Sequence, residues 1–155
     1  MAVTVGSKAP DFTLPDQDLK PVALSDAVKH QNVVLAFFPA AFTSVCTKEL
    51  CTFRDSMARL NETKATVFGI SVDTPFTLKK FGGEQQLNFP LLSDFNKDVI
   101  RSYGVVIDDL LGLKGLAKRA VFVIDRTGVV RHAEVLDDAR NEPDYGKVHA
   151  ALASL

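Results

Sequence analysis

The sequence predicts an α/β fold in which a central mixed β-sheet is flanked by helices. Apolar runs of strand length alternate with segments of helical periodicity through the middle of the chain. Near the C-terminus, two strand-like runs are joined by a short turn that contains a glycine. Strand, helix, strand and helix, followed by a hairpin and a last helix, describe an α/β sandwich around a mixed sheet.

The first strand and helix are predicted at residues 32–60. The run NVVLAFF at 32–38 is short, apolar and β-rich, which suits a buried strand, and Pro39 ends it because proline cannot donate to a ladder. Thr43 or Ser44 can then act as the N-cap of a helix that begins near Cys46. The apolar residues that give this helix its periodicity are Val45, Leu50, Phe53, Met57 and Leu60.

The remaining elements follow the same two periodicities. They are a strand at 66–72, a helix at 74–86, a short helix at 96–103, two strands at 119–125 and 129–136 that form a hairpin, and a helix at 143–155. The Leu- and Gly-rich stretch 106–118 fits neither period and is interpreted as a loop or mobile segment. No linker divides the chain, so residues 1–155 are expected to form one domain.

Charge and composition exclude several classes of partner. The 18 Lys and Arg nearly balance the 19 Asp and Glu, and they are scattered, so neither nucleic acid nor an anionic membrane is indicated. The N-terminus lacks a signal-peptide pattern, and the longest apolar run, 33–42, is too short to span a bilayer. We therefore expect a cytoplasmic protein that acts on small molecules or other proteins.

The two cysteines, Cys46 and Cys51, are the first candidates for chemistry. In a reducing compartment such a pair is more often catalytic or metal-binding than a structural brace. A cysteine in the first turn of a helix faces unpaired backbone N–H groups and the positive end of the helix dipole, which favour the thiolate. Cys46 is placed to be such a nucleophile. The alternative is a buried cysteine that behaves as a small hydrophobe.

Residues 39–46, PAAFTSVC, have the form PxxxTxxC and resemble the active-site motif of the peroxiredoxins, the AhpC/TSA superfamily. The segments APDFTL, SVD, FPLLSD and RAVFVID resemble the same family. The resemblance implies a thioredoxin-fold antioxidant enzyme that reduces hydrogen peroxide, alkyl hydroperoxides and often peroxynitrite. It implies no metal or haem, so no cofactor is expected.

Three matched residues have tasks in a displacement at a peroxide oxygen. The hydroxyl of Thr43 can face the sulfur and accept from the peroxide O–H, although a plain N-cap is the simpler role. Arg119, which matches the family's active-site arginine, would keep the sulfur ionised and bind a peroxide oxygen, whereas an arginine at a strand start is usually a solvated charge. By resemblance, Pro39 covers the thiolate and limits water.

Two further residues are candidates for supporting an active-site arginine. Glu49 matches a family glutamate, although acidic residues in the first turns of a helix are ordinary. Arg140 is a candidate for a similar supporting role. The three histidines are scattered, none is near Cys46 in sequence, and we interpret them as surface or packing residues, which disfavours a Cys/His hydrolase; they are His30, His132 and His149.

The spacing of Cys46 and Cys51 resembles the bacterioferritin-comigratory, or Q-type, branch, in which the second cysteine resolves the sulfenic acid as an intramolecular disulfide. Parts of the chain equally resemble the one-cysteine E-type branch.

On a regular helix, residues five apart have Cα atoms about 8.6 Å apart, whereas a disulfide tolerates only about 7 Å. Pairing therefore requires the helix start to unwind. Alternatively, Cys51 packs on the helix face and an outside thiol resolves Cys46.

Two other functions compete with a peroxidase. A thioredoxin-like disulfide reductase would normally show C-x-x-C, and a metal-binding or copper-delivery module would need more ligands than two cysteines.

The predicted cycle runs from the Cys46 thiolate to a sulfenic acid and a Cys46–Cys51 disulfide, which thioredoxin or a glutaredoxin-like protein reduces. Family resemblance implies a homodimer, with a monomer as the alternative.

Overall fold

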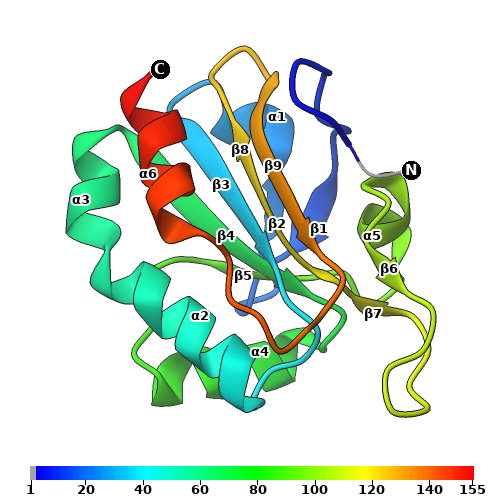
Figure 1. Ribbon diagram of the computed structural model, residues 1–155. Coiled ribbons are helices and arrows are strands. Elements are labelled where there is room, and N and C mark those ends of the chain that lie inside the picture. Colours follow the sequence, from blue (N-terminus) through cyan, green and yellow to red (C-terminus); the bar gives the residue numbers. More distant parts are fainter. Residues whose placement is uncertain (1–2) are drawn as a thin grey trace.

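The computed structural model describes residues 3–155 and has a five-stranded mixed sheet, which lies at its centre (Figure 1). The strand order is β5-β4-β3-β8-β9. The strands are β3 (Asn32–Phe37), β4 (Ala65–Ser71), β5 (Leu91–Ser93), β8 (Arg119–Ile124) and β9 (Val130–Leu136). β3 pairs in parallel with β4 and antiparallel with β8, and β8 and β9 form the predicted hairpin.

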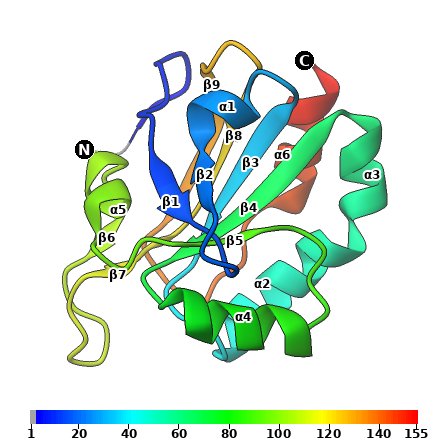
Figure 2. The same ribbon diagram turned by 180° about the vertical axis from the view of Figure 1, so that it is seen from behind.

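Helices cover both faces of the sheet. One face carries α2 (Ser44–Asp55), α3 (Met57–Glu62), α4 (Pro75–Glu84) and α6 (Tyr145–Ala153). The other face, seen from behind in Figure 2, carries α1 (Leu24–Ala27), α5 (Asp98–Ser102), β1 (Thr13–Pro15) and β2 (Pro21–Ala23). Because side chains alternate along a strand, β3 supplies both cores: Val33 and Leu35 belong to one, Val34 and Ala36 to the other.

The observed elements differ from the predicted ones in three ways. The long helix predicted after Cys46 is broken at Ser56, whose hydroxyl donates to the Thr52 carbonyl oxygen, a side-chain bond of the kind that bends helices. The stretch 106–118, predicted as a loop, contains the paired strands β6 (Val106–Ile107) and β7 (Leu116–Ala117). The short elements β1, β2, α1 and β5 were not predicted from the sequence.

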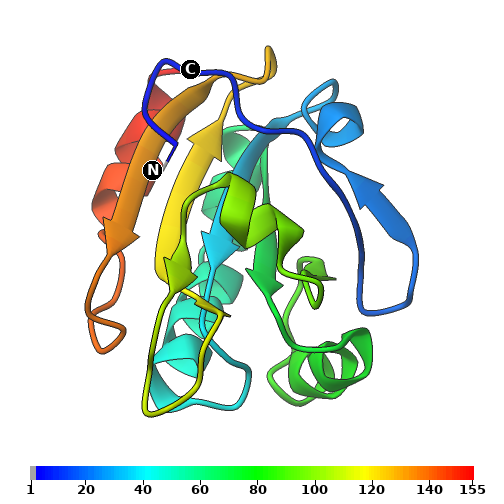
Figure 3. The ribbon, with the colours of Figure 1, turned by 90° about the vertical axis from the view of Figure 1, so that its right-hand side faces the viewer.

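The loop between β6 and β7 and the start of α2 lie at the same end of the sheet (Figure 3). β3 runs toward this end, so the chain passes directly from the central strand into the loop at 38–43 and then into α2. Among residues 3–155, no helix is long and apolar enough to cross a membrane.

Candidate active site

Cys46 is the third residue of α2 and lies in the first turn of that helix. The backbone of Thr43 is extended, and its carbonyl oxygen accepts from the Thr47 amide at 2.9 Å, which makes Thr43 the N-cap residue. Cys46 faces the sheet and is 1% exposed. Its sulfur is therefore close to the unpaired N–H groups of a helix start and shielded from bulk water.

Arg119 reaches Cys46 because of the strand register. Ala120 pairs with Phe37, so Arg119, one residue earlier on the antiparallel β8, lies beside the end of β3 where the chain turns toward α2. Arg119 Nη2 donates to Cys46 Sγ at 3.3 Å and to the carbonyl oxygen of Ala139 at 2.9 Å. The arginine side chain is 2% exposed, so its charge acts in a poorly solvated environment.

Glu49 holds the other side of the same guanidinium. Arg119 Nη1 donates to Glu49 Oε1 at 2.7 Å, and the carboxyl group is fully buried. Burial raises the pKa of Glu49 to about 7, while the attraction and hydrogen bond of Arg119 act in the opposite direction. The structure thus brings together Cys46, Glu49 and Arg119, three of the residues singled out in the sequence.

Thr43 is exposed and Pro39 is buried, and both belong to the segment that leads into α2. The Thr43 hydroxyl donates to the Ala40 carbonyl oxygen at 2.8 Å and makes no hydrogen bond to the helix, so the residue caps α2 through its backbone alone. With its proton engaged, the hydroxyl oxygen keeps its lone pairs available to accept. Thr43, Pro39 and Cys46 line one pocket.

This pocket has a volume of about 330 Å³, and much of its wall comes from the segment between β6 and β7. The wall residues from this segment are Leu110, Leu111 and Leu113, and Leu116, the first residue of β7, continues the wall. They were not predicted as site residues, because the segment shows no period and nothing in the sequence places it beside Cys46. The opening to the buried sulfur is therefore apolar.

Arg140 lies at the rim of the pocket rather than against Arg119. Its guanidinium is 88% exposed and pairs with Asp138 at 2.8 Å. The contact to Arg119 from this segment is made by the backbone of Ala139. These contacts include no hydrogen bond or ion pair between the Arg140 and Arg119 side chains, so they do not include the supporting contact that the sequence suggested for Arg140.

Asp73 was not among the predicted site residues, although it belongs to the SVD segment at the end of β4. Its Oδ2 accepts from the Ala41 amide at 2.8 Å and from the Ser71 hydroxyl at 2.7 Å. Ala41 belongs to the loop between β3 and α2. Asp73 thus ties the neighbouring parallel strand to the loop that carries Pro39 and Thr43.

Cys51 lies on α2 but on a different side from Cys46. Both thiols are free, and Cys51 is half-buried with its sulfur 3.5 Å from Gln85 Oε1 at the end of α4. α2 is continuous from Ser44 to Asp55, so both cysteines belong to one regular helix. A disulfide between them requires this helix to open.

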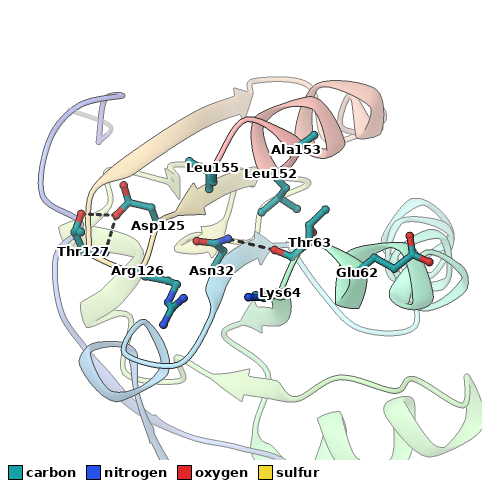
Figure 4. A pocket seen from close by; sticks show the side chains of 10 residues that line it. All are labelled: Asn32, Glu62, Thr63, Lys64, Asp125, Arg126, Thr127, Leu152, Ala153 and Leu155. Atoms are coloured by element: carbon teal, nitrogen blue, oxygen red, sulfur yellow. Dashed lines mark hydrogen bonds between the residues drawn. The ribbon is translucent and has the colours of Figure 1, made fainter.

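A larger pocket of about 570 Å³ lies at the opposite end of the sheet, where β3 begins (Figure 4). Asn32 donates to the Thr63 carbonyl oxygen there, and Asp125 accepts from Thr127. No cysteine or histidine lines it. None of the three histidines lines the Cys46 pocket either. We therefore identify the Cys46 pocket as the candidate active site because of the side chains that line it, although it is the smaller of these two pockets.

Together these features define a cysteine-dependent enzyme with an α/β fold, in which a buried thiol at a helix start contacts an arginine. Residues 5–133 match the AhpC/TSA family. The chain is 39% identical over 166 residues to the chloroplastic 2-cysteine peroxiredoxin of Chattonella marina var. antiqua, covering 100% of this chain and 80% of that protein. It is 40% identical over 135 residues to alkyl hydroperoxide reductase E of Mycobacterium tuberculosis, covering 86% of each.

The chain spans about half, 52%, of the length of the chloroplastic 2-Cys peroxiredoxin BAS1 of Arabidopsis thaliana. Among solved structures, the crystal structure of peroxidoxin BcpB from Mycobacterium tuberculosis superposes with a TM-score of 0.89 at 36% identity, covering 99% of this chain and 98% of that one. The chain belongs to the AhpC/TSA family of peroxiredoxins. The predicted thioredoxin-like α/β fold and the predicted enzyme class, a peroxide-reducing oxidoreductase, are confirmed.

Proposed function

We propose that this thiol peroxidase reduces hydrogen peroxide and organic hydroperoxides through a sulfenic acid on Cys46, which Cys51 resolves as an intramolecular disulfide. The observation that carries the first step is the 3.3 Å contact between Arg119 Nη2 and Cys46 Sγ at the base of a pocket that also contains Thr43. A fixed cation beside a helix-start sulfur favours the thiolate.

In the first step the thiolate attacks one peroxide oxygen, forming an S–O bond as the O–O bond breaks. Two electrons pass from sulfur to the peroxide, and the departing oxygen takes a proton to become water or an alcohol. Arg119 donates to the oxygens on which charge develops, and Thr43 accepts from the peroxide O–H and so fixes its orientation. Pro39 forms the wall that limits water around the sulfur.

The apolar wall of the pocket supports organic hydroperoxides as substrates beside hydrogen peroxide. Leu110, Leu113 and Leu116 line the approach to Cys46, and they offer contact area to an alkyl chain. Hydrogen peroxide has no such group and depends on the polar contacts alone. We therefore propose that the side chains at 110–116 add affinity in proportion to the apolar part of the peroxide.

The second step needs Cys51 to reach Cys46, and an external dithiol protein, thioredoxin or a glutaredoxin-like protein, then reduces the disulfide. A one-cysteine mechanism is the second candidate. Two observations favour it: the Cys51 sulfur contacts Gln85, at the end of α4, and both cysteines lie on a continuous helix. In that case an external thiol would resolve the sulfenic acid.

We propose a homodimer as the working assembly, with a monomer as the alternative. Three large apolar side chains at or near the pocket end are exposed: Phe42 (51%), Phe76 (72%) and Leu111 (94%). Exposed apolar side chains can be covered by a second copy of the chain where they form one continuous surface. Analytical ultracentrifugation of the reduced and oxidised protein distinguishes the two states.

The decisive experiment combines stopped-flow peroxide kinetics with intact mass after one equivalent of peroxide, on the wild type and on Cys51→Ser. We expect fast consumption in both. We expect a disulfide, at a mass loss of about two hydrogens, only in the wild type, and a sulfenic acid in Cys51→Ser. A sulfenic acid in the wild type, with no intramolecular disulfide, would assign the one-cysteine mechanism. Slow consumption by both would contradict the proposed role of Cys46.

A further inference from the structure

Cys46 and Glu49 lie three residues apart on α2, at a spacing that brings side chains together on one helix face. Both are buried, and both contact Arg119, which donates to Glu49 Oε1 at 2.7 Å and to Cys46 Sγ at 3.3 Å. The site therefore holds two acidic groups and one cation. One cation neutralises one anion, and a second buried anion would lack a counter-charge.

The surroundings of Glu49 reinforce this limit. Glu134 of β9, Glu142 before α6 and Tyr145 of α6 are near enough to interact electrostatically with Glu49, and none of them is a cation. Lys48, the adjacent lysine, pairs with Glu142 at 2.9 Å. Glu49 Oε2 is buried and has no hydrogen-bond partner among residues 3–155. A carboxylate in this position would be poorly stabilised on its second oxygen, so its protonated form is favoured.

We propose that Cys46 and Glu49 share a single negative charge across Arg119. When the thiol ionises, Glu49 holds a proton; when the sulfur loses its charge, Glu49 becomes the anion that balances Arg119. Glu49 is thus a positioning residue for Arg119 and a local store for one proton. The inference rests on the proposed role of Cys46 as the thiolate that reacts with peroxide.

The exchange balances within the peroxide step. The Cys46 thiolate, the protonated Glu49 carboxyl and one hydroperoxide become a sulfenic acid, a Glu49 carboxylate and one alcohol or water. The O–O bond breaks, an S–O bond forms, sulfur is oxidised by two electrons, and the departing oxygen gains the equivalent of the proton that Glu49 loses. One negative charge is present before and after, so Arg119 keeps one counter-ion throughout.

The Glu49→Gln variant separates this charge exchange from a purely structural role, because the amide oxygen can still accept from Arg119 but cannot ionise. Without the competing carboxylate, the thiolate should form at lower pH. We expect the midpoint of the pH profile for the second-order rate with hydrogen peroxide to fall by about one unit or more. The matched control is Glu142→Gln, which removes a nearby carboxylate without touching Arg119 and should move the midpoint much less.

A loss of positioning alone would lower the rate at every pH and leave the midpoint where it was. A measurement on the wild type also decides the matter if Glu49→Gln does not fold. The oxidised-minus-reduced infrared difference spectrum, taken near the pKa of about 7 of Glu49, should show loss of a protonated carboxyl band and gain of a carboxylate band. Both changes should persist in Glu142→Gln and vanish in Glu49→Gln.

An unmoved midpoint in folded Glu49→Gln, or a wild-type spectrum without the carboxyl signal, overturns the shared charge. Neither result affects the proposed peroxide chemistry of Cys46. That chemistry fails on a different observation, namely fast peroxide reduction by Cys46→Ser.

Discussion

Asp73, just beyond the end of β4, accepts a hydrogen bond from the backbone amide of Ala41, with a nitrogen–oxygen distance of 2.8 Å. Ala40, the preceding residue, accepts from the Thr43 hydroxyl at 2.8 Å. Two consecutive residues of the loop therefore connect the end of one strand to the N-cap of the helix that carries Cys46. The Asp73 carboxylate is itself held by the Ser71 hydroxyl. This arrangement fixes the position of the loop independently of any substrate.

Asp73→Ala should therefore slow the peroxide step although Asp73 lies outside the pocket. Loss of its carboxylate leaves the Ala41 amide without its partner, which should cost about 1–3 kcal/mol of stability. A loosened Thr43 should lower the second-order peroxide rate by about tenfold or more. Stopped-flow kinetics and urea unfolding measure the two effects. Asp137→Ala removes an exposed carboxylate, whose surface ion pair with Lys118 contributes little, and should change neither. Equal rates in both variants would mean that Asp73 is not a positioning residue.

Cys46→Ser should abolish peroxide reduction while the fold survives, because serine is close to cysteine in size and Cys46 makes no disulfide in the reduced protein. Circular dichroism checks the fold, and a peroxide-consumption assay checks the activity. Fast turnover by a folded Cys46→Ser protein would exclude Cys46 as the reactive thiol.

Arg119→Met should slow peroxide attack by a factor of about 100 or more, comparable with the loss of one preorganised donor. Methionine fills part of the same volume but leaves Cys46 without its cationic donor. The matched control is Arg140→Met, because Arg140 lies in the same pocket but is exposed and pairs with Asp138. Its rate should stay within about threefold of wild type, as is typical when an exposed ion pair is removed. Similar losses of rate in both variants would mean that the positive charge near the pocket, and not the contact of Arg119 with Cys46, accelerates the reaction.

The elements that could be predicted from the sequence are those in which apolar residues follow a clear helical or strand periodicity. The strand at 32–38, the helix start near Cys46 and the hairpin at 119–136 agree with β3, α2 and β8–β9 to within one or two residues. Strands of two or three residues, such as β1 and β5, are too short to show a period and are formed by tertiary contacts. The small ribbon of β6 and β7 is of this kind.

The site divides in the same way. Thr43, Cys46 and Glu49 are close in sequence, so a helix start alone places them together. Arg119 is 73 residues from Cys46, and its contact depends on the register of β8 against β3, so only family resemblance indicated it. The bond from Asp73 to Ala41 spans 32 residues and depends on the pairing of β3 with β4. No local pattern in the sequence encodes such contacts.

Glu49 should also give the protein a measurable dependence of stability on pH. Its pKa is raised from 4.5 to about 7 in the folded protein, so the folded state binds the proton more tightly than the unfolded state does. The stabilisation is therefore complete below about pH 4.5 and is lost as pH rises through about 7. The loss should be about 3 kcal/mol.

Comparison of Cys46→Ser with Cys46→Ser/Glu49→Gln isolates this contribution, because other carboxylates are common to both proteins. The difference in their free energies of unfolding should change between pH 4.5 and 7, in the sense that Cys46→Ser loses relative stability as pH rises. A difference that is constant over this range would show that the Glu49 carboxyl titrates normally.

The last prediction concerns the helix that holds both thiols. Cys46 and Cys51 lie on the continuous α2, where Cα atoms five residues apart are about 8.6 Å from each other, beyond the reach of about 7 Å that a disulfide allows. Oxidation to a Cys46–Cys51 disulfide must therefore open the backbone from about Thr43 to Phe53, and hydrogen exchange there should be faster in the oxidised protein.

Cys51→Ser should keep a nearly normal peroxide step, show no such increase, and pass to the sulfinic acid in excess peroxide. Exchange mass spectrometry before and after oxidation, with peptide mapping of the disulfide, tests this. Unchanged exchange in a protein that contains the disulfide would mean that α2 accommodates the bond without opening, against the distance argument.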